Sequence, residues 1–332
     1  MTEAAHPRDT FAYEGGEPVE TAFLEALARG RLHHAWLLTG PEGVGKATFA
    51  YRAARRLLGA RPDARFGLLG SSPDDPVSRQ ISSRSHPDLM VLEREIEGGK
   101  PRKNISVDDA RRLPEFFAKA PASAPFRVAI IDAADDMNIN AANALLKTLE
   151  EPPTRGVLFL VSHAPGGLIA TIRSRCRRLA FAGWDEGRVQ AFVEARTGLP
   201  SEDALRLTRM AKGAPGRAVA MAEEGALDAE RVAQEILRQL PGADEAALLA
   251  VADSFRGAEG QKRFEMLFER LQDEVRALAT GAAEAGASAG IDRWARAWEA
   301  LNALPRDVEA VNLDRADAFF TAIGRLREAA RA

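Results

Sequence analysis

The feature that most constrains this chain is a phosphate-binding loop that lacks its last defining residue. Residues 40–47 read GPEGVGKA, which fits the pattern G-x-x-x-x-G-K-[ST] at every defined position except the last. The run HAWLLT before it predicts a buried strand, and residues 46–58 predict the helix that follows. In such a loop small residues let backbone N–H groups converge on phosphate oxygens while a lysine adds a point charge. The candidate phosphate ligands are Gly40, Gly43, Gly45 and Lys46.

Two chemical groups that ATP hydrolysis needs are absent. Ala47 has no hydroxyl to bind magnesium, and the neighbouring Thr48 is turned away by about 100° on a helix. The run FRVAIID ends in Asp132, either a remnant magnesium-side carboxylate or a solvated strand end, and Ala133 follows where a hydrolysing enzyme would carry a carboxylate. The loop either binds nucleotide weakly or is a tight turn that binds nothing. A structural or regulatory subunit fits this pattern better than a motor.

Length and composition indicate a multidomain protein of a reducing compartment. The chain has 332 residues, which suggests two or three domains, and a net charge of −3, which gives no general attraction to nucleic acid. The single cysteine, Cys176, excludes an internal disulfide and a zinc site built from several thiolates, so a reducing cytoplasm is expected. No secretory signal is apparent, and no stretch approaches the roughly 20 apolar residues of a membrane span.

The order of predicted elements indicates an α/β domain followed by helices. Strands are predicted at 34–39, 88–92, 126–131 and 157–162, and helices at 19–29, 46–58, 106–119 and 139–150. This alternation implies a mostly parallel sheet covered on both faces. Residues 59–87 are rich in Pro, Asp, Ser and Arg, so we expect a connection or insertion with little core of its own.

After residue 181 the strand pattern stops. Three short helices are predicted at 184–196, 201–212 and 215–224, and longer ones at 228–239, 243–255, 260–280, 290–303 and 307–330. Residues 281–290 (GAAEAGASAG) read as a flexible connection. The predicted domains are therefore 1–182, 183–226 and 227–332.

A cluster of arginines follows the last predicted strand. Residues 171–178 read TIRSRCRR, with arginines at 173, 175, 177 and 178. The segment is either a solvated basic turn or a device that directs one arginine at a phosphate. Charge alone does not decide between the two.

Several motifs in this order resemble the clamp-loader subunits of bacterial DNA polymerase III, which belong to the AAA+ family. The motifs are LHHAWLLTGPEGVGKAT (32–48), SHPDL (85–89), RVAIIDAADDMNINAANALLKTLEEPP (127–153) and TIRSRC (171–176). The resemblance covers the first domain almost completely. It implies an AAA+ P-loop domain with a parallel sheet, a small helical lid, and an all-α collar that joins neighbouring subunits.

The resemblance also assigns roles to individual residues. In the family the Ser-Arg-Cys triplet supplies an arginine finger in trans to the ATP site of an adjacent motor subunit, so Arg175 would be the finger here. Lys46 and the loop glycines correspond to the nucleotide loop, Asp132 to the acidic strand end, and Ser162 to the polar sensor after the next strand. Arg217 in GAPGRA resembles the second sensor arginine of the lid.

Two departures from the family pattern narrow the expectation. The ATPase members carry a hydroxyl at position 47 and Glu at 133. The absence of both groups here favours the stationary, non-hydrolysing subunit of the clamp-loader ring over a motor subunit. Many relatives carry a four-cysteine zinc module before SHPDL, whereas residues 74–89 read DDPVSRQISSRSHPDL here. We therefore expect no metal, no required cofactor, and at most weak ATP or ADP binding.

The leading hypothesis is a non-catalytic clamp-loader subunit with a structural role. Its expected partners are the motor and delta subunits, the sliding clamp indirectly, and primed DNA within the complex, with no membrane. One alternative is a competent AAA+ motor ATPase, against which the groups missing at 47 and 133 argue. Another is a nucleic-acid-binding module in its own right, which the acidic charge and the lack of interleaved basic and aromatic residues disfavour.

Overall fold

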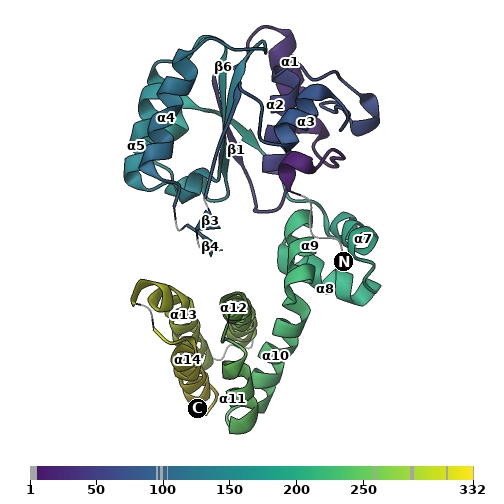
Figure 1. Cartoon of the computed structure of the whole chain (residues 1–332). Coiled ribbons are helices and arrows are strands. Elements are labelled where there is room, and N and C mark those ends of the chain that lie inside the picture. Colours follow the sequence, from purple (N-terminus) through teal and green to yellow (C-terminus); the bar gives the residue numbers. More distant parts are fainter. Residues whose placement is uncertain are drawn as a thin grey trace. The chain divides into compact units, whose positions relative to one another are not determined.

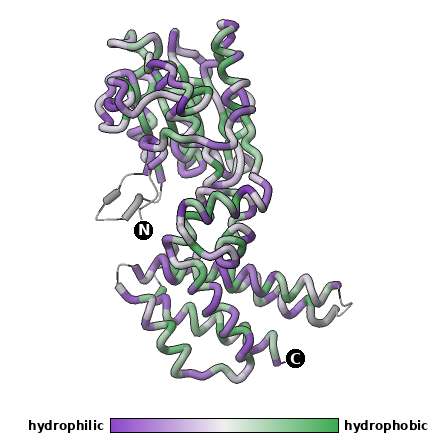
Figure 2. The backbone as a smooth tube through the Cα atoms, turned by 90° about the vertical axis from the view of Figure 1, so that its right-hand side faces the viewer, coloured by the Kyte–Doolittle hydropathy of each residue, from purple (hydrophilic) through white to green (hydrophobic). Residues whose placement is uncertain are grey.

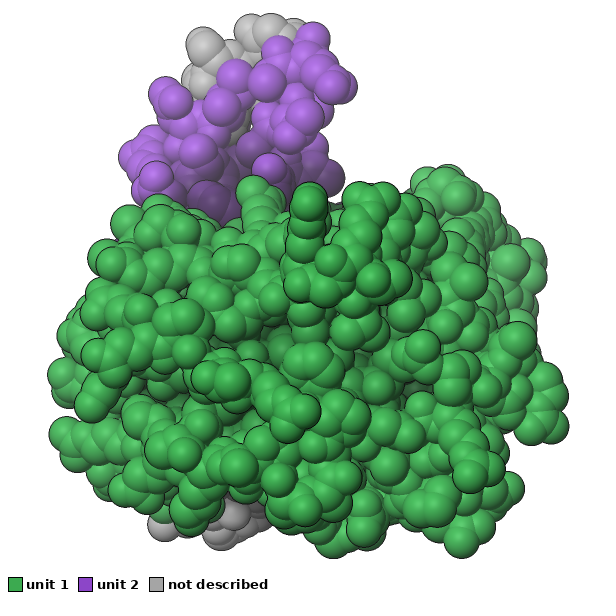
Figure 3. Space-filling model, turned by 90° about the horizontal axis from the view of Figure 1, so that it is seen from above, with its two compact units in different colours: residues 1–219 green, residues 220–332 purple. Residues whose placement is uncertain are grey.

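The chain forms two compact units, Met1–Val219 and Ala220–Ala332 (Figures 1 and 3). The computed structural model describes residues 6–94, 96–97, 100–102, 104–257, 259–284, 288–311 and 313–331. Among these residues no helix is both long and apolar enough to cross a bilayer. Each unit has a hydrophobic core of its own.

The first unit is built on a five-stranded parallel sheet, which confirms the predicted α/β class. Its strands are β1 (Ala35–Thr39), β2 (Leu89–Glu93), β5 (Arg127–Asp132), β6 (Gly156–Ser162) and β7 (Arg177–Ala180). Their order is β2-β5-β6-β1-β7, and every neighbouring pair is parallel. Two central strands, β1 and β6, are buried along their whole length, as continuous apolar runs predict.

Helices cover both faces of this sheet (Figure 1). One face packs against α1 (Glu17–Ala28), α2 (Lys46–Leu57) and α3 (Pro76–Ser82), and the other against α4 (Val107–Ala118) and α5 (Ile139–Glu150). Side chains alternate between the faces, so Trp36 and Leu38 of β1 enter one core while Leu37 enters the other. The hydroxyl of Ser106 accepts a hydrogen bond from the Asp109 N–H at 3.1 Å, which confirms the predicted start of α4.

Shorter elements complete the unit. They are the 3-10 turns Pro7–Asp9, Ala64–Phe66, Ala134–Asp136 and Pro165–Gly167, the two-residue strands β3 (Ile96–Glu97) and β4 (Lys100–Pro101), α6 (Ala170–Arg175), and the three helices α7 (Glu186–Thr197), α8 (Ser201–Ala211) and α9 (Pro215–Glu224). These last three helices lie where the sequence predicts them. Helix α6 and strand β7 are not predicted, because six residues are too few for a helical period and the strand RRLA has no apolar run.

The buried apolar side chains of residues 59–87 join the core of the first unit, in keeping with the prediction that this insertion has little core of its own. Within this segment Asp75 caps helix α3 by accepting from two backbone N–H groups, and Leu69 and Ile81 are almost fully buried against the α2 side of the sheet. Apolar positions are sparse in this stretch and follow no regular period. Their burial is therefore not visible in the sequence pattern.

A buried ion pair fastens this insertion to the helices beneath it. Arg52 Nε donates to Glu20 Oε1 at 2.7 Å, and both side chains are almost wholly buried. The second carboxylate oxygen of Glu20 accepts the Leu69 N–H at 3.2 Å, and Arg52 Nη2 donates to the Phe66 carbonyl at 2.7 Å. Side chains of α1 and α2 thus hold the insertion directly.

The second unit is entirely helical. It consists of α10 (Ala226–Gln239), α11 (Glu245–Asp253), α12 (Gly260–Glu284), α13 (Ser288–Val311) and α14 (Arg315–Ala330). Hydrophobic and hydrophilic positions alternate along these helices (Figure 2). Phe264, Leu267, Leu271 and Val275 of the predicted stripe are buried in its core, while Leu278 is 42% exposed.

Two predicted breaks in this unit differ from the structure. Helix α13 continues through Pro305 to Val311, so the predicted ending near 303 is wrong. In the predicted connection 281–290, residues 281–284 belong to α12 and 288–290 to α13, and 285–287 lie outside the described residues. Alanine favours helix strongly, which offsets the glycines of that stretch.

Candidate functional site

The P-loop lysine is bound to its own loop. Lys46 begins α2 and is only 3% exposed, and its Nζ donates to the carbonyls of Gly40 at 2.7 Å and Pro41 at 2.5 Å. Burial lowers the pKa of Lys46 to about 8. The ammonium group that would bind phosphate in a nucleotide site therefore has two acceptors within the loop.

The glycines of the loop lie against other segments of the chain. A Cβ on Gly43 would come within 2.3 Å of the Arg217 backbone nitrogen, and the Gly216 N–H donates to the Gly43 carbonyl at 2.9 Å. A Cβ on Gly45 would come within 2.7 Å of the Tyr13 ring. Both glycines have positive φ, at 77° and 94°, so no other residue type fits easily. The first turn of α9 and the Tyr13 ring therefore pack directly on the P-loop.

The acidic end of β5 is largely enclosed. Burial raises the pKa of Asp132 to about 6, and the nearby charge of Glu93 acts in the same direction. The next residue, Ala133, is buried and offers no carboxylate. The charges of Asp132 and Lys46 are close enough to affect each other's pKa, so the fold does bring these two predicted residues together.

Ser162, the predicted polar sensor, already has a partner. It is fully buried at the end of β6, and its Oγ donates to Asp135 Oδ1 at 2.8 Å. The same carboxylate accepts the backbone N–H groups of His163 at 2.6 Å and Ala164 at 3.3 Å. In the structure Asp135 fixes the loop that follows β6, a tertiary role that no local motif signals.

Arg217, the predicted second sensor, lies beside the loop. Its Nη1 is 3.6 Å from Glu42 Oε2, a residue inside the P-loop. Together with the Gly216 to Gly43 hydrogen bond, this ion pair joins α9 to the loop through both backbone and side chain. The structure thus brings Arg217 next to the P-loop glycine Gly43.

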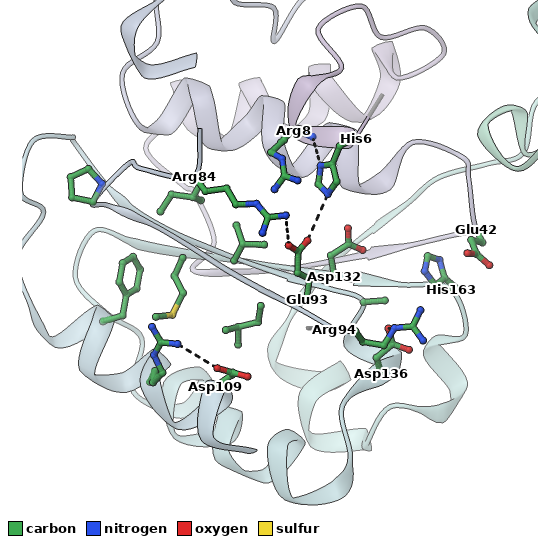
Figure 4. Close-up of a pocket in the computed structure, with 18 residues that line it drawn as sticks. His6, Arg8, Glu42, Arg84, Glu93, Arg94, Asp109, Asp132, Asp136 and His163 are labelled. Carbon is green, nitrogen blue, oxygen red and sulfur yellow. Dashed lines mark hydrogen bonds and ion pairs between the residues drawn. The ribbon is translucent and has the colours of Figure 1, made fainter. Parts of the chain in front are cut away.

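A broad cavity of about 1130 Å³ opens at the carboxyl ends of β2 and β5 (Figure 4). Of the predicted site residues in the described part of the chain, Asp132 lines it and Lys46, Ser162 and Arg217 do not. Most of its carboxylates have basic partners: Glu93 lies 3.7 Å from His6 and 2.8 Å from Arg84. The hydrogen bond from His6 and the charge of Arg84 help to lower the pKa of Glu93. Because its charges compensate one another, the cavity does not resemble a phosphate site.

Three arginines of the segment 171–178 have structural roles. Arg173 Nη1 donates to the carbonyls of residues 165 and 166, at 3.1 and 3.0 Å. Arg178 Nε donates to the hydroxyl of Thr39 at 3.0 Å, and the guanidinium of Arg177 lies over the ring of Trp36. The segment therefore forms α6 and β7, and the arginines at 173, 177 and 178 remain solvent-exposed.

Arg175 is the last residue of α6 and is less exposed than the other three arginines of the segment. Its side chain is 37% exposed, Nη1 donates to the Thr171 carbonyl at 3.3 Å, and Nη2 lies 3.1 Å from Glu150 Oε1. The adjacent Cys176 is partly enclosed, and burial raises the pKa of its thiol to about 12. Arg175 can accordingly meet a group outside this chain, whereas Cys176 is an unreactive thiol.

No metal centre accompanies these residues. Within the described ranges, no three His, Cys, Asp or Glu side chains are grouped so that they could hold a metal ion. The candidate site therefore consists of a P-loop whose lysine is bonded within the loop and, elsewhere on the same unit, the partly exposed Arg175.

Comparison with known proteins places this arrangement in a family. Subunit delta′ of DNA polymerase III from Pseudomonas aeruginosa is 42% identical over 148 residues, covering 45% of this chain and 43% of that protein. The delta′ subunit of Escherichia coli K12 is 30% identical over 222 residues, covering 67% and 64%. Subunit tau of Salmonella typhimurium is 34% identical over 182 residues, covering 54% and 26%. The matches thus span less than two thirds of each relative's length.

These matches confirm the resemblance of the motifs to subunits of DNA polymerase III, and two of the three relatives are delta′ subunits. The family described as "DNA polymerase III, delta subunit" matches residues 16–185, slightly more than half of the 332 residues. The matched region contains the P-loop, the strand that ends in Asp132, and Arg175. The chain belongs to the DNA polymerase III delta subunit family.

Proposed function

We propose that the chain is a non-hydrolysing subunit of a clamp loader, the assembly that places a ring-shaped sliding clamp on primed DNA. The observation that carries the proposal is the P-loop whose lysine is held by the carbonyls of Gly40 and Pro41. Ala47 and Ala133 supply neither a magnesium ligand nor a group to orient water. Such a subunit serves the assembly by its structure and not by its own ATP turnover.

The same proposal gives Arg175 an active role in trans. The arginine is partly exposed at the end of α6, whose Ile172 is fully buried and whose Arg173 is hydrogen-bonded to the preceding loop. A planar guanidinium on so firmly packed an element suits recognition of a phosphate held by a neighbouring motor subunit.

The remaining parts of the proposal concern assembly. Residues 183–226 would serve as the lid and 227–332 as a helical collar that joins motor and delta subunits. The helical unit supports this because it carries exposed apolar side chains, Leu249, Leu278, Trp298, Leu313 and Phe320. The complex would act in the cytoplasm. Because the chain is acidic overall, contact with primed DNA would be shared with the partner subunits.

The test is ATP hydrolysis by a reconstituted complex. Arg175→Ala should leave the subunit folded and incorporated, yet lower hydrolysis at one neighbouring site, because arginine fingers contribute roughly 10³ to 10⁵ in rate at their site. Arg175→Lys should be nearly as defective, since a point charge lacks the planar fork. Lys147→Ala, which removes an exposed positive charge from the nearby α5, is the matched control. Turnover at the wild-type rate in the Arg175→Ala complex would eliminate the finger.

The isolated chain provides a second arm of the test. Phosphate release from ATP with magnesium, clamp and primed DNA should be negligible. Robust turnover that disappears on Lys46→Ala would show that the chain is itself a motor ATPase.

We also infer that the chain needs no zinc and no bound nucleotide. The insertion that holds four cysteines in many relatives is fastened here by Glu20 and Arg52. Elemental analysis after dialysis should find no zinc in folded protein. One zinc per chain would contradict the inference.

A further inference from the structure

Arg175 forms an ion pair with a residue on another helix of its own unit. Glu150 is the last residue of α5, and Arg175 is the last residue of α6. Glu150 Oε1 lies 3.1 Å from Arg175 Nη2, and the two side chains are 52% and 37% exposed. The pair therefore lies at the surface, where a group from another molecule can approach it.

A hydrogen bond and an ion pair restrict the orientation of the guanidinium. Nη1 donates to the Thr171 carbonyl within α6, and Nη2 faces the Glu150 carboxylate from α5. Because the guanidinium is planar, contacts with two different helices limit the directions in which it can point. Each Nη retains a second N–H and Nε has one more, so donors remain available for a phosphate.

The supporting helices are themselves well anchored. Ile172 of α6 and Leu145 of α5 are fully buried in the same core cluster. Residues before α6 are held through Arg173, which donates to the carbonyls of 165 and 166. The acceptors of Arg175 therefore lie on a rigid support, which is what an orienting contact requires.

A contribution to folding stability does not explain why a carboxylate stands at position 150. An exposed ion pair adds little to folding stability, and the partial negative charge of a helix C-terminus disfavours a carboxylate at the end of α5. The effect that remains is the restriction of a long side chain that would otherwise sample many rotamers. Such restriction helps a group that must meet a phosphate in one geometry.

We propose that Glu150 is a positioning residue for Arg175, which orients the guanidinium before the neighbouring nucleotide site engages it. This inference rests on the proposed role of Arg175 in trans. Glu150 acts through its charge, which attracts the guanidinium as an ion pair at 3.1 Å. A neutral side chain of the same length should therefore orient the guanidinium less well.

The experiment measures kcat and KM for ATP in the reconstituted complex, with incorporation of each variant checked by gel filtration. Glu150→Ala should lower kcat by about two- to five-fold, the range that loss of one exposed ion pair gives, with KM unchanged. Glu150→Gln, which keeps the length of the side chain and removes its charge, should lower kcat by a similar factor. Glu150→Lys, which places a like charge beside the guanidinium, should fall below Glu150→Ala.

The matched control is Glu151→Ala, an exposed carboxylate one residue further along. It should leave kcat unchanged, and a loss equal to that of Glu150→Ala would assign the effect to general surface charge. A second control is Glu150→Ala in an Arg175→Ala background, where no further loss is expected. An additional loss there would indicate a structural role independent of Arg175.

Two failures can be distinguished. If Arg175→Ala is defective but neither Glu150→Ala nor Glu150→Lys changes kcat, the positioning role is wrong and the arginine finger stands. If Arg175→Ala itself hydrolyses ATP at the wild-type rate, the proposed function fails and the positioning role fails with it.

Discussion

At the scale of single residues, Asp88 shows how one buried carboxylate organises a turn. It is fully buried just before β2 and accepts backbone N–H groups from residues 122, 123 and 124, at 2.7, 2.9 and 3.1 Å. Arg127 Nε lies 3.3 Å from the same carboxylate. Burial pushes the pKa of Asp88 upward, but the three hydrogen bonds and the arginine outweigh it and lower the pKa.

Asp88→Asn should destabilise the protein in a pH-dependent way. The substitution leaves the buried Arg127 uncompensated, which costs about 3–5 kcal/mol of unfolding free energy. Because the folded pKa is lowered, the stabilisation is complete above the unfolded pKa of about 3.9 and is lost as pH falls through the folded value. The difference between wild type and variant should therefore be constant above about pH 5 and shrink in more acidic solution.

Urea denaturation between pH 3 and 8 measures this difference. Asp74→Asn, which changes an 86% exposed aspartate, should have little effect at any pH. A pH-independent difference for Asp88→Asn would show that the charge of this carboxylate is unimportant.

At the scale of elements, the insertion 59–87 depends on two residues outside it. Glu20→Ala should lower the free energy of unfolding by about 3–5 kcal/mol, because it leaves the buried charge of Arg52 without a partner carboxylate. It also removes the acceptor of the Leu69 N–H, so amides in residues 61–75 should exchange hydrogen faster. Hydrogen exchange with mass spectrometry resolves this segment. Glu25→Ala, which breaks an exposed pair with Arg29, is the control and should leave these amides unchanged.

Sequence patterns predict elements well where burial is periodic and poorly where it is not. The strands that end at Thr39 and Asp132 and the cap at Ser106 are local features, and all are found as expected. Helix α6, strand β7 and the insertion depend on contacts with distant residues. The Glu20–Arg52 pair joins positions 32 apart in sequence, and neither residue stands out from its neighbours.

In the candidate site, too, local features can be predicted from the sequence and contacts between distant residues cannot. The loop glycines and Lys46 are identified by spacing alone, because the turn imposes its own residue types. The partners of these residues, Tyr13 and the backbone of Arg217, come from segments that only the tertiary fold brings near. The sequence therefore shows which groups are missing from the site, namely those at positions 47 and 133. The structure shows which parts of the chain contact the P-loop residues that are present.

At the scale of the whole molecule, two units with separate cores should respond separately to core mutations. Phe319 is fully buried in the helical unit, whereas the adjacent Phe320 is 38% exposed. Phe319→Ala should cost about 3–5 kcal/mol by leaving a cavity, while Phe320→Ala, the matched control, should cost less than about 1 kcal/mol.

Hydrogen exchange of the intact chain checks this prediction unit by unit. For Phe319→Ala, faster exchange should be confined to residues 220–332. Equal acceleration in residues 6–219 would show that the two units unfold as one cooperative body.

The contact between Lys46 and its own loop has a consequence for how such a chain can change over evolution. A loop that needs phosphate to hold its shape must keep every side chain that recruits the phosphate and its metal. Here the carbonyls of Gly40 and Pro41 already satisfy the lysine, so the turn keeps its shape without that recruitment. If the chain does not hydrolyse ATP, as proposed, it requires no hydroxyl at position 47 and no carboxylate at 133, while the glycines and the lysine still shape the turn.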